Sequence, residues 1–334
     1  MVGFEPVIQQ VKHTFQQLDC SAGGLMIVQD NEMVVEEYWG TQSKQCPMKT
    51  VNEQTQFHLA SIRKTYIGFA AAYALYHGYI RSLDDEITLY LKSDLDVLKG
   101  VTIRHLLTHT HGLRKVNEDI IREFEPGENW AYRGIGVDLL VEIIHLTTKQ
   151  TAASILHDVV FKPLNFKETN WVGALSEHHV EVIHHNSPFW YESELTDGSK
   201  MNMYASIREL AQWGLLHLHK GVVNDVQVIP KEIFELATAI QAPKSIPSVA
   251  AKNGFFWFVQ ENERGVSNSE LSPLLPEGSY QLLGYTSVAI LVIPLFNLVA
   301  VRAFNSFGSP DGFNYLDDVH DFGALCAQCS VGDE

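Results

Sequence analysis

The sequence has few cysteines, few cations and no long apolar run. Four of its 334 residues are cysteines: Cys20, Cys46, Cys326 and Cys329. This number excludes a disulfide scaffold of the kind that small secreted domains use. The 24 lysines and arginines are outnumbered by 40 aspartates and glutamates, so the formal net charge is −16. Nucleic-acid binding needs a basic surface, and an anionic membrane repels an acidic chain, so we expect neither partner.

The N-terminus has none of the features of a secretory signal. Residues 1–19 contain no basic stretch followed by an apolar run and a small-residue cleavage site. The longest apolar runs, at 69–76 and 288–296, are much shorter than the roughly 20 residues that cross a bilayer. These absences predict a cytoplasmic protein.

Two groups of residues have spacings that suggest redox or metal chemistry, but neither is predicted to have it. Cys326 and Cys329 are spaced like a redox pair, yet they lie near the end of a predicted helix, where the helix dipole opposes a thiolate. The histidines of His178–His185 are clustered, but no cysteine or spaced histidine pair accompanies them. We expect two helical thiols, a polar loop and no metal site.

Apolar periodicity divides the chain into strand-rich ends and a helical middle. Helices are predicted at 4–18, 62–77 and 314–328, and strands within 24–39, 254–261, 286–294 and 297–305. The predicted fold is α+β: an α/β/α sandwich with an antiparallel sheet, plus an inserted all-helical domain. Residues 1–56 and 250–334 are expected to form the sheet domain and 57–249 the mostly helical domain. The active site is expected in the cleft between them.

Ser61 and Lys64 begin the apolar helix predicted at 62–77. Residues three apart share a helix face, so the lysine amine lies beside the serine hydroxyl. Burial lowers the pKa of a lysine, and a neutral lysine can accept the serine proton. The Ser61 amide, at a helix N-terminus, can bind a developing oxyanion. The spacing alone is weak evidence, because about one such match is expected by chance in a chain of this length.

The surrounding sequence is more specific. Phe57–Lys64 reads FHLASIRK, Val101–Leu113 reads VTIRHLLTHTHGL, and Glu125–Gly136 reads EPGENWAYRGIG. In this order the segments resemble the serine β-lactamase and penicillin-binding-protein superfamily, and most closely its class C β-lactamase-like esterases, peptidases and amide hydrolases. The resemblance extends from about residue 20 to residue 305. It implies the β-lactamase/transpeptidase-like fold.

The resemblance also implies catalytic roles. The family's nucleophile maps to Ser61, its lysine to Lys64 and its tyrosine to Tyr132, whose pKa a neighbouring ammonium would lower. The family's Lys-Thr-Gly or His-Thr-Gly strand motif matches best at Gly284–Ser287, and an amide near Val288 would be the second oxyanion donor. The implied reaction is acyl transfer in two steps, without a metal or an organic cofactor.

Two departures from the family pattern affect the substrate prediction. Gly134 occupies the position of an asparagine, with Arg133 before it, and Tyr285 replaces a basic residue. An amide and a cation that would bind a peptide or a substrate carboxylate are therefore missing. The residues expected on the substrate or oxyanion side are Arg133, Gly134, Tyr285, Thr286, Ser287 and Val288.

These departures favour an esterase or small-amide hydrolase acting on a small ester, amide or peptide. A β-lactamase or D-amino-acid peptidase is the alternative, and a non-catalytic binding protein that keeps the fold is an alternative of another class. The sequence leaves open the physiological substrate, whether β-lactams are hydrolysed or only acylate the serine, and the oligomeric state. It also leaves open the roles of His111 and of the His178–His185 cluster.

Overall fold

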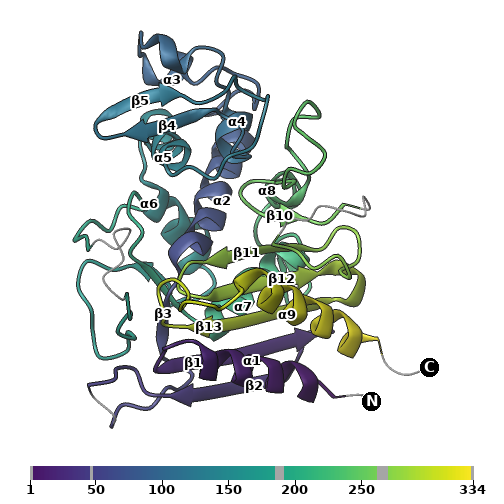
Figure 1. Ribbon diagram of the computed structural model, residues 1–334. Coiled ribbons are helices and arrows are strands. Elements are labelled where there is room, and N and C mark those ends of the chain that lie inside the picture. Colours follow the sequence, from purple (N-terminus) through teal and green to yellow (C-terminus); the bar gives the residue numbers. More distant parts are fainter. Residues whose placement is uncertain (1–2, 46–47, 185–191, 262–269, 332–334) are drawn as a thin grey trace.

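A six-stranded antiparallel sheet is built from both ends of the chain (Figure 1). The computed structural model describes residues 3–45, 48–184, 192–261 and 270–331. The strand order is β10-β11-β12-β13-β1-β2. The strands are β1 (Ala22–Gln29), β2 (Glu32–Gly40), β10 (Phe258–Val259), β11 (Tyr280–Gly284), β12 (Val288–Ile293) and β13 (Leu298–Phe304).

The central strands have apolar runs rather than alternating patterns because both of their faces are covered. Every residue of β12 and β13 is buried. β1 pairs with β13 on one side, with Leu25 opposite Arg302, and with β2 on the other. The turn between β1 and β2 uses Asp30 and Asn31, both with positive φ, which is the backbone that a tight hairpin requires.

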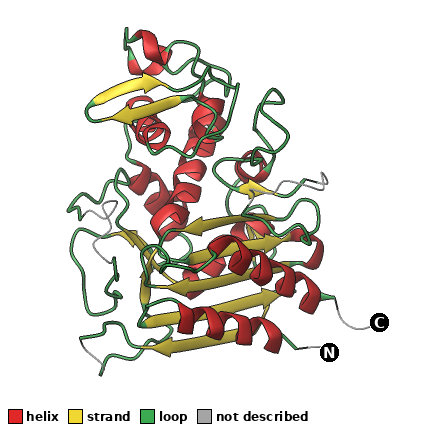
Figure 2. Ribbon diagram, viewed as in Figure 1, coloured by secondary structure: helices red, strands yellow, loops and turns green. Residues whose placement is uncertain are grey.

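Helices cover both faces of the sheet (Figure 2). α1 (Glu5–Gln17) and α9 (Tyr315–Ser330) pack together on one face, where Phe15 contacts Gly23 of β1. α7 (Ile207–Leu218) covers the other face and contacts β1, β12 and β13. This layered arrangement confirms the predicted α+β sandwich with an antiparallel sheet.

Helix α2 (Arg63–Tyr76) is the buried axis of the helical region. It contacts α5 (Ile135–Thr148), α6 (Ala152–Leu156) and α8 (Lys231–Thr238). Gly68 is required there, because a Cβ atom at this position would lie 2.7 Å from the Phe255 carbonyl oxygen. A loop before β10 thus approaches the α2 backbone directly.

Shorter elements complete the described part of the chain. They are β3 (Gln56–His58), η1 (Ala60–Ile62), α3 (Thr88–Leu91), η2 (Asp96–Leu98), α4 (Ile103–Leu107), β4 (Leu113–Val116), β5 (Asp119–Arg122), η3 (His157–Phe161), β6 (Asn170–Trp171), β7 (Met203–Ser206), β8 (Val222–Val223), β9 (Val226–Gln227) and η4 (Pro294–Phe296). No helix in the described residues is both long and apolar enough to cross a membrane.

The strand predicted at 254–261 was wrong for most of its length. Only Phe258–Val259 form a strand, and Phe256 has a φ of 68°. The aromatic residues that suggested a strand are buried in a loop that packs on α2. β11, which lies beside β12, was not predicted.

Candidate active site

Ser61 lies in a short 3₁₀ turn, η1, between β3 and α2. The residue before it, Ala60, has a φ of 46°, a left-handed conformation that costs a non-glycine residue free energy. Two hydrogen bonds hold this backbone: Leu59 N donates to Met203 O at 2.8 Å, and Ala60 N donates to His58 Nδ1 at 3.2 Å. The serine is therefore presented by a strained turn fixed to its neighbours.

Lys64 joins the other two predicted catalytic residues. Its Nζ atom lies 2.7 Å from Ser61 Oγ and 2.8 Å from the Tyr132 hydroxyl. Ser61 and Lys64 belong to consecutive turns at the start of α2, whereas Tyr132 lies 68 residues further along the chain, just before α5. The structure thus brings the Ser61 and Tyr132 hydroxyls within hydrogen-bonding distance of the Lys64 amine.

The charge state of Lys64 is set by its surroundings. Only 6% of the residue is exposed. Burial is the main cause that holds the pKa of Lys64 well below its ordinary value, and the Arg63 guanidinium acts in the same direction. The carboxylates of Glu270 and Asp138 oppose this shift. A lysine with a strongly lowered pKa can be neutral near pH 7 and can accept a proton from Ser61.

The expected lowering of the Tyr132 pKa was wrong. Although 39% of the residue is exposed, its hydroxyl is surrounded by protein, and this burial raises the pKa of Tyr132. A hydrogen bond with Ser61 acts in the opposite direction but is outweighed. The expectation assumed a neighbouring ammonium, whereas the lowered pKa of Lys64 favours a neutral amine. Tyr132 is therefore a neutral phenol that can pass protons but is not a phenolate.

The loop that carries Tyr132 is fixed on two sides. Ala131 N donates to His109 O at 3.0 Å, and the His109 ring lies 4.6 Å from the Tyr132 ring. The Trp130 indole donates to Asn253 Oδ1 at 2.8 Å, and Asn253 is fully buried. His109 and Asn253 thus support the loop that carries Tyr132, although no sequence motif distinguished Asn253.

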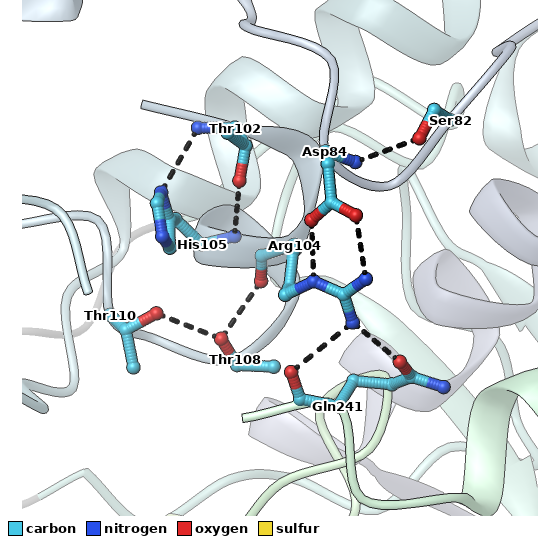
Figure 3. A network of polar contacts seen from close by, with 8 residues as sticks. All are labelled: Ser82, Asp84, Thr102, Arg104, His105, Thr108, Thr110 and Gln241. Atoms are coloured by element: carbon cyan, nitrogen blue, oxygen red, sulfur yellow. Dashed lines mark hydrogen bonds and ion pairs between the residues drawn. The ribbon is translucent and has the colours of Figure 1, made fainter. Parts of the chain in front are cut away.

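A polar network around Arg104 of α4 (Ile103–Leu107) extends this support (Figure 3). Arg104 forms a bidentate ion pair with Asp84 and donates to Gln241 Oε1 at 2.7 Å. Gln241 N in turn donates to Asn253 O at 2.8 Å. The helical region and the loop that contacts Trp130 are therefore joined through Arg104.

The end of β11 contacts the turn that carries the nucleophile. A Cβ atom at Gly284 would lie 2.4 Å from Leu59 O, so only glycine allows this approach. Thr286 is fully buried, and its hydroxyl donates to His58 O at 2.6 Å. Thr286 thus holds the strand end in place rather than facing substrate.

The predicted strand-motif residues differ in their placement. Tyr285 is 52% exposed, and its ring packs edge-on against Phe307. Ser287 has a φ of 62° and donates its amide to Gly284 O, and Val288 pairs with Gly284 within the hairpin. Gly284 is the residue that abuts the nucleophile turn, which makes the adjacent Tyr285 amide another candidate for the second oxyanion donor. The Val288 amide stays a prediction.

The structure shows the surroundings of Arg133 and Gly134, the two residues that follow Tyr132. The Arg133 guanidinium forms a bidentate ion pair with Glu123, at 2.8 and 3.0 Å, so its charge already has a partner. Gly134 is the N-cap of α5, and a Cβ atom there would meet no atom within 4 Å. The position of the missing asparagine is therefore open space.

Gly134→Asn is expected to fold and to react faster with a penicillin. An added Cβ meets no atom within 4 Å, and one added hydrogen bond to the substrate corresponds to about a 2- to 10-fold gain in rate. The measurement is the second-order rate constant for labelling by a fluorescent penicillin. Gly134→Ala, which adds a Cβ without an amide, is the matched control. Equal rates for the two variants would contradict this role for the missing amide.

Two further polar residues act on the site through their charge. Glu270 is partly buried, and burial raises the pKa of its carboxyl to about 7, opposed by the charge of Lys64. Arg63 is 8% exposed, and its charge acts on both Lys64 and Tyr132. Sequence reasoning missed both residues, since Glu270 has no local motif and the intervening positions of a serine–lysine pair carry no signal of their own.

The histidines of the Val101–Leu113 segment have structural contacts. His105 and Thr102 form a reciprocal capping box at the start of α4 (Figure 3). The His111 ring accepts a hydrogen bond from Leu113 N at 2.9 Å. A Cβ atom at Gly136 would lie 2.6 Å from the same ring, so His111 packs directly on the first turn of α5.

The remaining histidine and cysteine groups lie elsewhere. His179 Nδ1 accepts a hydrogen bond from Ser176 N, and His185 falls outside the described residues. Within the described ranges, no group of three or more His, Cys, Asp or Glu residues is arranged to hold a metal ion. Cys326 and Cys329 are free thiols in α9, and burial raises the pKa of each.

Comparison with known proteins places this geometry in a family. A model of the beta-lactamase family matches residues 7–324. An uncharacterized protein of Alkalihalophilus pseudofirmus is 53% identical over 327 residues, covering 98% of this chain and 96% of that protein.

Two solved structures share the fold. A penicillin-binding protein homolog from Caulobacter crescentus has a TM-score of 0.76 at 15% identity, covering 98% of this chain and 97% of its own. EstCE1, described as a hydrolase with promiscuous acyltransferase activity, has a TM-score of 0.72 at 16% identity, covering 96% and 98%. At these identities the likeness shows the fold alone, and the class C-like subdivision stays a prediction. Because the family model spans nearly the whole sequence, the chain belongs to the beta-lactamase family, as its motifs predicted.

Proposed function

We propose that the protein is a serine hydrolase that cleaves a small ester or amide through an acyl-enzyme on Ser61. The observation that carries this proposal is the position of Lys64, whose amine contacts both Ser61 Oγ and the Tyr132 hydroxyl while burial lowers its pKa. Family membership and the hydrolase activity described for EstCE1 support the same reaction class.

Acylation uses the amine as a base. Ser61 Oγ attacks the carbonyl carbon, and its proton passes to neutral Lys64. The Ser61 and Tyr285 amides bind the resulting oxyanion. The proton then moves from Lys64 through the Tyr132 hydroxyl to the leaving alcohol or amine as the carbonyl–heteroatom bond breaks. In deacylation, water takes the place of the alcohol or amine, and its proton follows the reverse route back to Ser61.

The substrate is inferred to be an ester or small amide rather than a penicillin. Efficient binding of a carboxylate needs a cation, and Tyr285 stands where relatives carry one. Arg133 does not replace it, because its guanidinium is paired with Glu123. A missing charge-assisted hydrogen bond corresponds to about a 10- to 150-fold loss.

Covalent labelling tests this proposal. Wild-type protein treated with a fluorophosphonate is expected to gain one adduct by intact mass, located on Ser61, and to hydrolyse a p-nitrophenyl ester. Ser61→Ala is expected to lose both the adduct and the turnover. An unlabelled wild type, or a variant that reacts like the wild type, would overturn the assignment. Turnover abolished by Ser61→Ala would exclude a binding protein that merely keeps the fold.

A further inference from the structure

Residues 253–257 form the loop that leads into β10, and this loop is tied to distant parts of the chain. Asn253 O accepts a hydrogen bond of 2.8 Å from Gln241 N, and Phe256 N donates to Leu107 O at 3.1 Å. Phe256 is buried with a φ of 68°, a backbone conformation that costs a bulky residue free energy. Such strain is typical of segments that serve a functional site.

Two contacts join this loop to the segment that carries Tyr132. The first is the hydrogen bond of 2.8 Å that the Trp130 indole donates to Asn253 Oδ1. The second is a row of rings: the Phe256 ring lies 5.3 Å from the His109 ring, which lies 4.6 Å from the Tyr132 ring. The loop before β10 thus supports Tyr132 from the side opposite to substrate-facing solvent, through one directional bond and one ring contact.

Of these two contacts, the hydrogen bond fixes position more strictly, because it weakens steeply with distance and angle. Asn253 is fully buried, and its side-chain nitrogen donates to Trp257 O at 3.3 Å. This second bond orients the amide, so that its oxygen faces Trp130. Without that oxygen, the indole N–H would lose its acceptor in the protein interior.

The position of Trp130 is passed on to the catalytic groups over a short stretch of backbone. Tyr132 is the second residue after Trp130, and its hydroxyl lies 2.8 Å from Lys64 Nζ. A displacement of about 1 Å is enough to break a bond of this length and can cost a reaction up to about 10²-fold in rate. The contact between Tyr132 and Lys64 therefore depends on where Trp130 is held.

We propose that Asn253 is a positioning residue for proton transfer, which holds the Tyr132 hydroxyl against Lys64 by fixing Trp130. The inference rests on the proposed function and assigns part of it to a residue outside the catalytic contacts. In acylation, the proton taken from Ser61 passes from Lys64 through the Tyr132 hydroxyl to the leaving oxygen as the carbon–oxygen bond breaks. A misplaced Tyr132 should therefore slow the release of leaving groups that need this proton.

Two esters with the same acyl group test this role. p-Nitrophenyl acetate releases a stabilised anion, whereas phenyl acetate releases a phenol whose pKa, like that of tyrosine, is about 10. Their kcat/KM values report acylation at pH 7.5. Asn253→Leu, which removes the acceptor at similar volume, is expected to raise the p-nitrophenyl-to-phenyl ratio about 3- to 30-fold over wild type. Trp130→Phe removes the donor and should raise it similarly.

A ratio measured within one preparation does not depend on the fraction of active enzyme, so a purely structural loss would not move it. Trp171→Phe is the matched control, because it removes an indole hydrogen bond of 3.1 Å to Lys200 O in another part of the chain and should keep the wild-type ratio. The double variant Trp130→Phe/Asn253→Leu should be no worse than Asn253→Leu, since both substitutions remove the same bond.

A measurement without turnover separates this inference from the proposed function. In Ser61→Ala protein labelled with ¹³C at the tyrosine ζ carbons, the Tyr132 resonance is expected to shift on adding Asn253→Leu but not on adding Trp171→Phe. An unshifted resonance, or ester ratios within about twofold of wild type in both Asn253→Leu and Trp130→Phe, would overturn the positioning role and leave the hydrolase intact. A missing fluorophosphonate adduct together with a shifted resonance would instead overturn the hydrolase and leave Asn253 as the residue that positions Tyr132.

Discussion

Replacing Lys64 with methionine is expected to lower kcat for a p-nitrophenyl ester by about 10²–10⁴-fold, the contribution typical of a positioned general base. The amine is the group in contact with both Ser61 and Tyr132, so its loss removes the acceptor for the serine proton and interrupts the route to the leaving group. Methionine preserves most of the side-chain volume in the apolar surroundings of α2.

The same substitution is expected to leave the protein at least as stable as the wild type at pH 7. The folded-state pKa of Lys64 is lowered, so folding must release a proton that the unfolded chain binds. This cost is largest below the folded-state pKa and shrinks as the pH rises towards about 10.4, the unfolded value. The stability gap between variant and wild type should therefore narrow from pH 7 to pH 10, as measured by urea unfolding.

Wild-type activity should follow the same titration. kcat/KM is expected to rise with pH as Lys64 loses its proton, because the neutral amine is the active form.

Lys99→Met is the matched control for Lys64→Met, since Lys99 is exposed and paired with Asp96 at the surface. A Lys64→Met variant that keeps more than a tenth of the wild-type kcat would contradict the role of the amine as general base.

Gly284→Ala is expected to reduce kcat/KM by about 10²–10³-fold. This is the size of the reduction that the loss of one oxyanion donor typically causes. The added Cβ would lie 2.4 Å from Leu59 O, a backbone atom that cannot rotate away. Either the end of β11 or the nucleophile turn must move, and both carry candidate oxyanion donors. An overpacked contact of this kind also costs about 1–3 kcal/mol of stability.

Gly134→Ala provides the matched control for this substitution. Its added Cβ meets no atom within 4 Å, so activity and unfolding should stay near wild type. Circular dichroism and urea unfolding show whether Gly284→Ala remains folded while its activity falls. A folded Gly284→Ala enzyme with kcat/KM within threefold of wild type would contradict a tight contact between β11 and the nucleophile turn.

Much of the fold follows from local sequence signals. The amphipathic pattern at 4–18 corresponds to α1, and the apolar segment at 62–77 to α2. The strand prediction failed at 254–261, because a buried loop rich in aromatic residues has the same composition as a buried strand. The order of strands in the sheet depends on contacts between distant segments, which periodicity does not encode.

In the candidate site, too, the residues could be predicted from local sequence, whereas properties that depend on contacts between distant segments could not. Ser61, Lys64 and Tyr132 lie in recognisable segments, and the structure places them together. The pKa of Tyr132 could not be predicted, because it depends on the charge state of a buried neighbour. The support that Asn253 gives to the Tyr132 loop was equally inaccessible, since Trp130 and Asn253 lie 123 residues apart in the chain.

The position of β1 has a consequence for synthesis of the chain. Its partner on one side is β2, but its other edge pairs with β13, which leaves the ribosome about 270 residues later. At roughly 5–20 residues per second, that edge stays unpaired for roughly 14–55 s. An unpaired strand edge is a template for aggregation, so the nascent chain should depend on chaperones until β13 emerges.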